Sequence, residues 1–462
     1  MEPAKPSQDL LRSLTDEHVL RALMREGQLT RAELATATGV SKPTAGESVR
    51  RLVTAGLVAD TGHRTPGGRG RGRVGTYYAL APEVGVALAV SIAPEGIIAE
   101  CIDPYGAVLL RAGEPITRPA HPDQVAAGLR SAVTRVLTPP PTTLKTPTAH
   151  ANPTAYANLT AHTNAIAHTN PIAHINPIEH INPIEHINPT GPTGPTRPTG
   201  HPPVRLAVVS AADPVDRATG RMVHLPDSPF LLGDLDPVAV LAPMVDGPVI
   251  VDNDVNWAAR AERQAAAAPG DFAYLYLGEG LGCAVISEGD VRRGHRGLAG
   301  EIAHLLTVGS DGQATSLIDV FGQLGLRQPG STAIDTDRLL AAVGPGSPAP
   351  ATLQIVARAV AGAIAAVVAL ADPAQVILGG PWGRHPLLAD AVADAVADLP
   401  RPVPVQAATP LAEPSLAGAR DSALTRLRAD IVTRATEARA MVTSPALEGR
   451  RLNGTKNALL EG

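Results

Sequence analysis

Aromatic and cysteine residues are scarce in this chain of 462 residues. It has 2 Trp, 6 Tyr and 3 Phe against 44 Gly and 44 Pro. Its core must therefore be built from Ala, Val and Leu, and part of the chain is expected to lie outside that core. Two cysteines are too few for a disulfide framework or for a zinc site of clustered cysteines. We expect both to be reduced core residues.

Long apolar segments are also missing. The longest nearly continuous apolar run, residues 359–371, has 13 residues, fewer than the ~20 that a bilayer core requires. The first ten residues, MEPAKPSQDL, contain no positively charged region followed by an apolar stretch, which a secretory signal would need. These features predict a cytoplasmic protein that makes no membrane contact.

Charge is unevenly distributed along the chain. The net charge is −5, yet residues 1–80 carry twelve Lys and Arg against eight Asp and Glu. The other 382 residues therefore carry a charge of −9. A small basic module joined to a larger acidic body is typical of a nucleic-acid-binding domain attached to a second functional part.

The basic module has the pattern of a winged helix-turn-helix domain. A first helix is expected after Thr15 or Asp16, a second at RAELATAT and a third after Ser41. The turn TGVS between the second and third helices is short and contains Gly, as a helix-turn-helix requires. Two extended segments, residues 57–60 and 74–80, enclose HRTPGGRGRGR, which predicts a wing.

The third helix and the wing carry the candidate DNA contacts. Val49, Leu52 and Val53 are expected to face inward, leaving an outer face with donors of the right size for a major groove. The wing arginines alternate with glycine and would form a flexible cationic tip for phosphate or the minor groove. A solvated helical bundle with a basic loop is the alternative. The predicted DNA-binding residues are Ser41, Lys42, Thr44, Ser48, Arg50, Arg51, Arg69, Arg71 and Arg73.

The rest of the chain alternates strand and helix patterns, which indicates an α/β body. VGVALAVSIA and GIIAECID predict two strands, with a turn at residues 103–106 after them and a helix at residues 122–137. Further strands are expected at residues 204–210, 249–251, 272–277, 283–287 and 375–378, and an Ala-rich helix at residues 352–370.

Residues 138–203 interrupt this body. They consist mainly of Pro, Thr, Asn and His, and a His or Tyr recurs every six residues from His150 to His186. Such a segment buries too little apolar surface to offset its ordering entropy, so we predict a disordered insert. A left-handed parallel β-helix is the less favoured alternative. The histidines could bind a divalent ion, but repeat expansion in a tolerant loop explains them better. A disordered tail is expected at residues 444–462.

Three motifs of the body could bind a ligand. Asn253 and Asp254 follow a strand, so they would project into a cleft at its carboxyl end, where Asp254 could accept a hydroxyl proton or bond a sugar. LGEGLG, residues 277–282, would let a ligand approach the backbone. Glu301 and His304 would lie on one side of a helical segment. Each motif also has an ordinary structural explanation, namely a helix cap, a hairpin turn and a structural pair.

Together these pieces resemble the ROK family of repressors, open reading frames and kinases, and specifically its transcriptional regulators. The resemblance covers residues 16–137 and 204–431. GRVGTYYALAPEVGVAL is similar to the family's junction between DNA reader and kinase-like body, and VVSAADPVDRATG to its Pro-containing loop. DNDVNWAARAE is similar to its Asn-Asp motif, LGEGLGCAVISEGDVRRGHRGLAGEIAH to its glycine-to-histidine signature, and ADPAQVILGG to its C-terminal strand.

The resemblance implies a two-lobed, actin-like body behind the DNA-binding domain. Its first lobe would comprise residues 81–137 and 204–248, and its second lobe residues 249–443. By the same resemblance, Asp254 stands where a kinase of the family keeps its base. The residues implied to contact a sugar are Asn253, Asp254, Glu301 and His304.

Two departures from the family pattern count against catalysis and metal binding. Family kinases carry an Asp and a Gly-Gly-Thr phosphate loop after their first strand, where this chain reads AVSIAPEGI. Pro94 lacks an N–H donor and Glu95 would repel phosphate. The family's zinc site uses the signature His with three clustered Cys, whereas LLTVGSDGQATSLIDVFG contains none. We therefore expect no cofactor, no metal and no enzyme activity.

The sequence thus predicts a DNA-binding transcriptional regulator of carbohydrate-related genes, a repressor rather than an activator. Its non-catalytic body would form a homodimer or a dimer of dimers on a pseudo-palindromic operator in double-stranded DNA. A sugar or sugar phosphate would be its effector. One alternative is an active kinase for a hexose or N-acetylhexosamine. The other is a constitutive DNA-binding protein whose body has lost ligand recognition.

Overall fold

The computed structural model describes the chain in six stretches, residues 8–65, 74–138, 202–225, 230–266, 268–344 and 351–443. Three predicted features lie outside the described residues: the wing tip, the repeat-containing insert apart from its ends, and the tail after residue 443. The assignments of Arg69, Arg71 and Arg73 therefore stay predictions.

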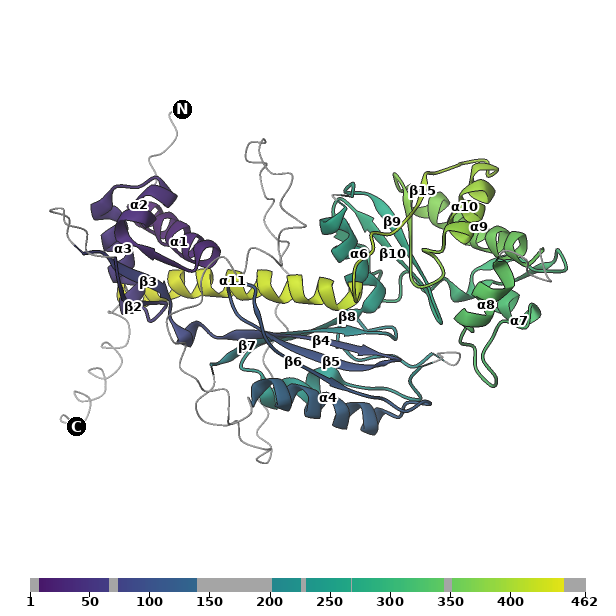
Figure 1. The fold of residues 1–462 in the computed structure, drawn as a ribbon, viewed down its shortest axis with the longest axis horizontal. Coiled ribbons are helices and arrows are strands. Elements are labelled where there is room, and N and C mark those ends of the chain that lie inside the picture. The colour runs from purple at the N-terminus through teal and green to yellow at the C-terminus, as the bar shows by residue number, and fades with distance from the viewer. Residues whose placement is uncertain are drawn as a thin grey trace, which may run out of the picture. The chain divides into compact units, whose positions relative to one another are not determined.

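The N-terminal domain consists of three helices and a small antiparallel sheet (Figure 1). Its elements are α1 (Gln8–Glu26), β1 (Gln28–Thr30), α2 (Arg31–Thr38), α3 (Lys42–Thr54), β2 (Val58–Arg64) and β3 (Thr76–Leu80), with strand order β1-β3-β2. Thr30 and Glu33 form a capping box at α2, and the Ser41 hydroxyl accepts a bond from the Thr44 N–H at the start of α3. The predicted second and third helices and both wing strands are confirmed.

The first helix begins earlier than predicted. α1 starts at Gln8, so Thr15 and Asp16 lie in its interior and the prediction that one of them caps it is wrong. Thr15 bonds back to the carbonyl of Leu11 at 2.8 Å, and Asp16 is buried. Because no Gly or Pro interrupts residues 8–26, the helix continues through two residues that otherwise favour a helix start.

The first sheet of the body has the strand order β6-β5-β4-β7-β8. β4 (Val86–Ala93), β7 (Val204–Ala211) and β8 (Val249–Asn253) run parallel, while β5 (Gly96–Ile102) and β6 (Val108–Glu114) are antiparallel additions. Val86, Leu88, Val90 and Ile92 share one core with α4 (Pro122–Leu137), and Ala87 and Ala89 of the same strand share another with α11 (Pro414–Thr443). Because successive side chains of a strand point to opposite faces of the sheet, α4 covers one face and α11 covers the other.

The second sheet has the order β11-β10-β9-β14-β15 and is mixed. Its strands are β9 (Phe272–Leu277), β10 (Leu281–Ser287), β11 (Asp290–Val291), β14 (Val376–Gly379) and β15 (Val405–Ala407). The helices of this part of the body are α6 (Asp254–Ala265), α7 (Leu317–Gln323), α8 (Thr336–Val343), α9 (Ala351–Ala371) and α10 (Pro386–Ala397). The remaining elements are α5 (Pro237–Leu241), the hairpin of β12 (Leu306–Val308) and β13 (Ala314–Ser316), and 3₁₀ turns at Pro82–Val84, Ala242–Met244 and Ile302–His304.

Helix α9 confirms the Ala-rich helix predicted at residues 352–370. Among the described residues it is the one helix long and apolar enough to cross a membrane by length and composition. Half of its most apolar window is buried, and Val356, Val360 and Ile364 lie in the core that α9 shares with the second sheet. Burial of this kind is typical of a helix that packs one apolar face into a protein core.

The lobe boundary differs from the prediction in two places. The predicted second lobe, residues 249–443, includes β8 and α11, but β8 pairs with β7 and α11 packs on β4 and β7. Strand β8 satisfies the backbone groups along the edge of β7, and α11 covers an apolar sheet face that would otherwise be exposed. Both elements therefore belong with the first sheet.

Helix α11 joins the body to the N-terminal domain through one hydrophobic core. Its buried residues Leu416, Ala419, Ala423, Leu427 and Ile431 recur every three or four positions and form one stripe. The same core contains Leu20 and Leu23 of α1 and Trp257 of α6. At the end of the helix, Arg439 bonds the Asp9 backbone and side chain in α1. The N-terminal domain is thus packed directly on the body.

Replacing Leu427 by Ala should lower the free energy of unfolding by ~2–5 kcal/mol, because it removes a fully buried side chain from this shared core. Leu370→Ala is the control: this helical Leu is 90% exposed, and its loss should cost less than about 0.5 kcal/mol. Urea denaturation followed by circular dichroism measures both. Similar losses for the two variants would contradict the role assigned to α11.

Candidate functional site

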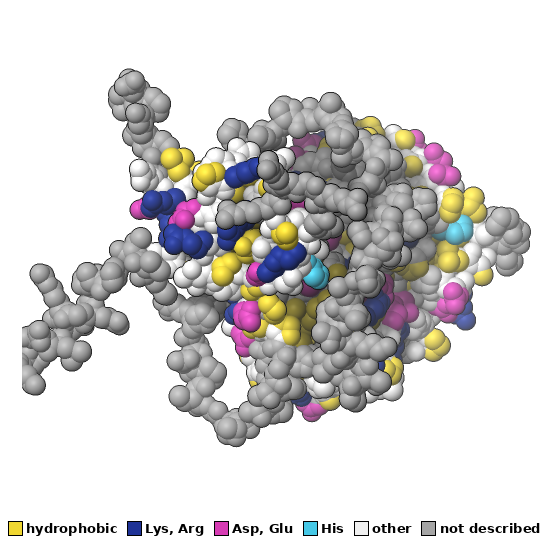
Figure 2. All heavy atoms as spheres, turned by 60° about the vertical axis from the view of Figure 1, so that its left-hand side comes forward, with side chains coloured by type: hydrophobic (Ala, Val, Ile, Leu, Met, Phe, Trp, Pro, Cys, Tyr) yellow, Lys and Arg dark blue, Asp and Glu magenta, His cyan; other side chains and the backbone are white. Residues whose placement is uncertain are grey.

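The start of α3 presents a polar surface. Ser41, Lys42, Thr44 and Arg50 are exposed there, and Figure 2 shows Lys and Arg side chains gathered over this side of the molecule with a few carboxylates among them. Arg50 is 72% exposed and pairs with Glu47 at 2.6 Å. A surface ion pair of this kind is worth ~0–1 kcal/mol, so Arg50 can exchange Glu47 for a phosphate at little cost.

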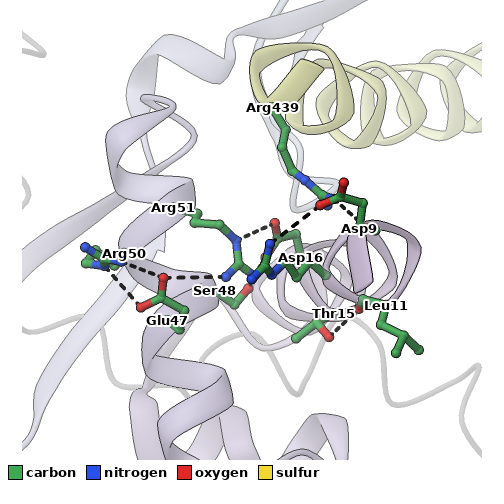
Figure 3. Close-up of polar contacts among 10 residues, drawn as sticks. Asp9, Leu11, Thr15, Asp16, Glu47, Ser48, Arg50, Arg51 and Arg439 are labelled. Atoms are coloured by element: carbon green, nitrogen blue, oxygen red, sulfur yellow. Dashed lines mark hydrogen bonds and ion pairs between the residues drawn. The ribbon is translucent and has the colours of Figure 1, made fainter. Parts of the chain in front are cut away.

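Ser48 and Arg51 do not belong to that surface. The Ser48 hydroxyl is buried and donates to Asp16 of α1 at 2.5 Å, and Arg51 pairs with the same carboxylate at 2.5 Å (Figure 3). The prediction that both lie on the exposed face is therefore wrong. They occupy the inner face because Asp16, a charge buried in α1, requires charge-assisted partners from α3. Val53, predicted to face inward, is 42% exposed instead.

A cavity of about 810 Å³ lies where the two sheets of the body meet. All four predicted sugar-contacting residues line it: Asn253, Asp254, Glu301 and His304. This volume is within the range of small-molecule sites. Segments separated by more than forty residues in the sequence thus meet at one cavity.

Asn253 and Asp254 stand where β8 ends and α6 begins. The Asn253 side chain caps α6 by accepting a bond from the Val255 N–H at 2.9 Å, and its amide donates to the Asp213 carbonyl at 3.4 Å. One Asp254 oxygen accepts from the same Val255 N–H at 2.8 Å. The capping role and the cavity-lining role therefore coexist in this motif.

Glu301 and His304 flank the 3₁₀ turn Ile302–His304 and face the same cavity. Gly300 positions this turn: its φ is 102°, and a Cβ there would lie 1.8 Å from the carbonyl oxygen of Cys283. Only glycine permits so close an approach to β10. The predicted proximity of Glu301 and His304 is realised through this turn, not through an α-helix.

The cavity is also lined by two residues that the sequence did not single out as ligand contacts: Asp213 follows β7, and Tyr276 lies within β9. Glu279 lines it from the turn LGEGLG, which was predicted to let a ligand approach. Asp213 lies within the quoted loop VVSAADPVDRATG. The rule that ligands bind outside the carboxyl ends of parallel strands applies to β7 as it does to β8, and it could have identified Asp213.

Burial and mutual repulsion shift two of the cavity carboxyls strongly. Burial, together with the nearby charges of Asp213, Glu301 and Glu95, raises the pKa of Asp254 to about 7. Burial and the charge of Asp213 raise the pKa of Glu301 to about 7. Each is therefore close to half protonated at neutral pH.

The residues around His304 do not fit the zinc site that the resemblance brings with it. Within the described stretches no group of three or more His, Cys, Asp and Glu could hold a metal ion. Cys283 lines the cavity, but burial raises its pKa to about 12, so it stays a neutral thiol and a poor ligand.

Two family models match the chain. Residues 14–67 match the MarR family and residues 203–316 match the ROK family. A stretch of 151 residues is 31% identical to the bifunctional enzyme NanE/NanK of Brucella suis, covering 32% of this chain and 28% of that enzyme. A stretch of 67 residues is 39% identical to a glucokinase of Halalkalibacterium halodurans, covering 14% and 20%. The chain thus spans less than a third of these curated relatives.

The fold resembles a crystal structure of a ROK family transcriptional regulator, described as a homologue of the E. coli MLC protein. The TM-score is 0.53 at 16% identity, over 92% of this chain and 99% of that one, so the likeness concerns the fold. A MarR-like helix-turn-helix domain at residues 14–67 thus precedes a ROK domain at residues 203–316. The predicted resemblance to ROK-family regulators and the predicted fold class are confirmed.

Raised carboxyl pKa values make stability depend on pH. Asp254 and Glu301 titrate near 4 when unfolded and near 7 when folded, so between these values the folded state binds more protons. The contribution of these two groups to the free energy of unfolding is fully present below about pH 4 and is lost as the pH rises through about 7. We expect Asp254→Asn combined with Glu301→Gln to reduce the loss between pH 5 and pH 8 by roughly 5 kcal/mol, about half from each group.

Urea titrations at several pH values measure this slope. Asp337→Asn changes an exposed carboxyl of α8 and is the control, which should keep the full slope. An unchanged slope in the double variant would contradict the raised values.

Proposed function

We propose that this protein is a cytoplasmic DNA-binding transcriptional regulator, acting as a repressor of carbohydrate-related genes. The observation that carries the proposal is a MarR-like domain with an exposed, cationic start of α3, packed on a body that holds a ligand-sized cavity. Ser41, Lys42 and Thr44 would approach base edges at the start of the recognition helix, and Arg50 would contact phosphate. Arg69, Arg71 and Arg73 would add phosphate or minor-groove contacts from the wing.

The cavity would hold a sugar as the effector, bound by Asn253, Asp254, Glu301 and His304. Helix α11 offers a physical route from cavity to DNA. Residues 413–416 at its start line the cavity, and Arg439 near its end bonds Asp9. A ligand that prefers one position of α11 would shift the equilibrium between DNA-binding and non-binding forms, provided that it binds the two forms unequally.

Two copies would bind one operator. A two-fold dimer, or a dimer of dimers, places two recognition helices on neighbouring turns of one DNA face, so the operator would be a pseudo-palindrome in double-stranded DNA. The body would supply the dimer contacts.

The competing function is a sugar kinase. Asp254, with a pKa of about 7, has the protonation behaviour of a general base. Against catalysis, the turn after β4 presents Pro94 and Glu95 to the cavity, where a phosphate would require backbone N–H donors. We infer that the body is not an enzyme.

DNA binding is expected to depend on the exposed cations of the N-terminal domain. Arg50→Ala should weaken binding several-fold on all sequences, because it removes about one phosphate contact and its counterion release. Lys42→Ala should weaken binding and also reduce the preference for the operator sequence, because it removes a base contact. The triple change of Arg69, Arg71 and Arg73 to Ala should also make the slope of log affinity against log salt concentration less steep, by the amount expected for about three phosphate contacts. Fluorescence anisotropy with the chain's own promoter DNA at several salt concentrations measures these effects.

Arg401→Ala is the matched control for these variants, because Arg401 is a 57% exposed Arg of the ROK domain, paired with Asp372. It should leave DNA binding unchanged. Wild-type protein without salt-sensitive, sequence-preferring binding would refute the proposed regulator.

A coupled assay for ADP release, run over hexoses and N-acetylhexosamines, tests the kinase alternative. We expect no turnover above a reaction without protein. Turnover that Asp254→Asn abolishes would establish the kinase and overturn the non-enzymatic assignment.

A further inference from the structure

The cavity has a one-sided charge. Among the described residues that line it, seven are Asp or Glu, and none is Lys or Arg. The seven are Glu95, Glu114, Asp213, Asp254, Glu279, Glu301 and Glu413. Carboxylates gathered in a partly enclosed space focus a negative potential that attracts cations and repels anions.

Three of these carboxylates are neutralised by arginines outside the lining. Arg135 pairs with Glu114 at 2.6 Å, Arg118 pairs with Glu279 at 2.6 Å, and Arg111 pairs with Glu413 at 2.5 Å. None of these guanidinium groups belongs to the lining, so none is placed to receive an anionic ligand. The other four carboxyl groups are those of Glu95, Asp213, Asp254 and Glu301.

Glu95 is the accessible member of those four. It lies in the turn between β4 and β5 and is exposed, and it forms no ion pair within the described residues. Its charge acts inside the cavity, since it raises the pKa of Asp254 and of Tyr276. On the same side of the cavity, Arg118 donates a hydrogen bond to the Pro94 carbonyl at 3.1 Å and another to the Glu279 carboxylate.

We propose that the cavity selects an amino sugar, with a free cationic amine, over neutral and phosphorylated sugars, and that Glu95 is the residue that sets this preference. The inference rests on the proposed ligand-binding role of the cavity. An ammonium group gains Coulomb energy from Glu95 and from the other carboxyl groups that line the cavity. A phosphate group in the same place meets Glu95 with no Lys or Arg among the lining residues to offset the repulsion.

Isothermal titration calorimetry on the full chain without DNA tests the proposal. The probes are three hexose skeletons, glucose, mannose and galactose, each as the 2-amino sugar, the neutral hexose and the 6-phosphate. Wild-type protein should bind the amino form of at least one skeleton at least fivefold more tightly than its neutral form, and the phosphate form weakest. Putrescine, an amine without a sugar ring, should not bind.

Glu95→Gln removes the charge and keeps the size of the side chain. It should weaken binding of the amino sugar about fivefold, leave the neutral sugar unchanged and strengthen the phosphate form. Glu83→Gln is the matched control, because Glu83 is exposed and lies outside the cavity lining. It should change none of the three affinities. Circular dichroism checks that both variants are folded.

Several results would overturn the proposal: phosphate forms that bind as tightly as amino forms, an amino-sugar affinity that Glu95→Gln leaves unchanged, putrescine binding equal to the amino sugars, or no binding of any probe at millimolar concentration. The proposed DNA-binding function is tested separately by anisotropy without sugar. Failure of one inference is therefore distinguishable from failure of the other.

Discussion

The structure depends on the burial of one stripe of α11. From Leu416 to Ile431 this stripe is about 22 Å long at 1.5 Å per residue, and it covers the first sheet while also contacting α1. Buried ion pairs fix its position along the sheet: Glu100 of β5, with a side chain 1% exposed, pairs with Arg420 of α11 and with Arg111 of β6. A buried carboxylate of this kind requires both partners. The helix therefore cannot slide without breaking charge-assisted bonds.

The electrostatics of the cavity distinguish it from a phosphate-transfer site. Phosphoryl transfer requires cations and backbone donors around the transferred group, whereas this lining contributes carboxylates. Burial and neighbouring carboxylates raise the pKa of both Asp254 and Glu301. The lining has polar groups that could bond hydroxyls, and its carboxylates would repel the phosphates of a nucleotide.

Much of the fold could be predicted from residue patterns. The caps at Thr30 and Ser41 and the apolar strands β4, β7, β9 and β14 are strong local signals, and the structure contains the elements they predict. β6 and α11 were missed. VLLRAGE is an edge strand with mostly exposed residues, and the apolar stripe of α11 is diluted by charged residues between its members. Burial that depends on residues far away in the sequence cannot be predicted from a local sequence pattern.

The residues of the candidate site likewise fall into those that a local sequence motif identifies and those whose placement depends on distant residues. Asn253, Asp254, Glu301 and His304 were identified as motifs and share one cavity. Ser48 and Arg51 could not be placed correctly, because only Asp16, more than thirty residues earlier, turns them inward. From the sequence, Asp16 has the pattern of a helix cap, and nothing local indicates that it lies buried in the middle of α1.

The contact of Asp16 with Ser48 and Arg51 also constrains how the N-terminal domain can move. It locks α3 to α1, while Arg439 locks α1 to α11. A displacement of α11 would therefore carry α3 along with α1. In the proposed two-fold dimer, such a displacement would alter the separation of the half-sites that the protein can span.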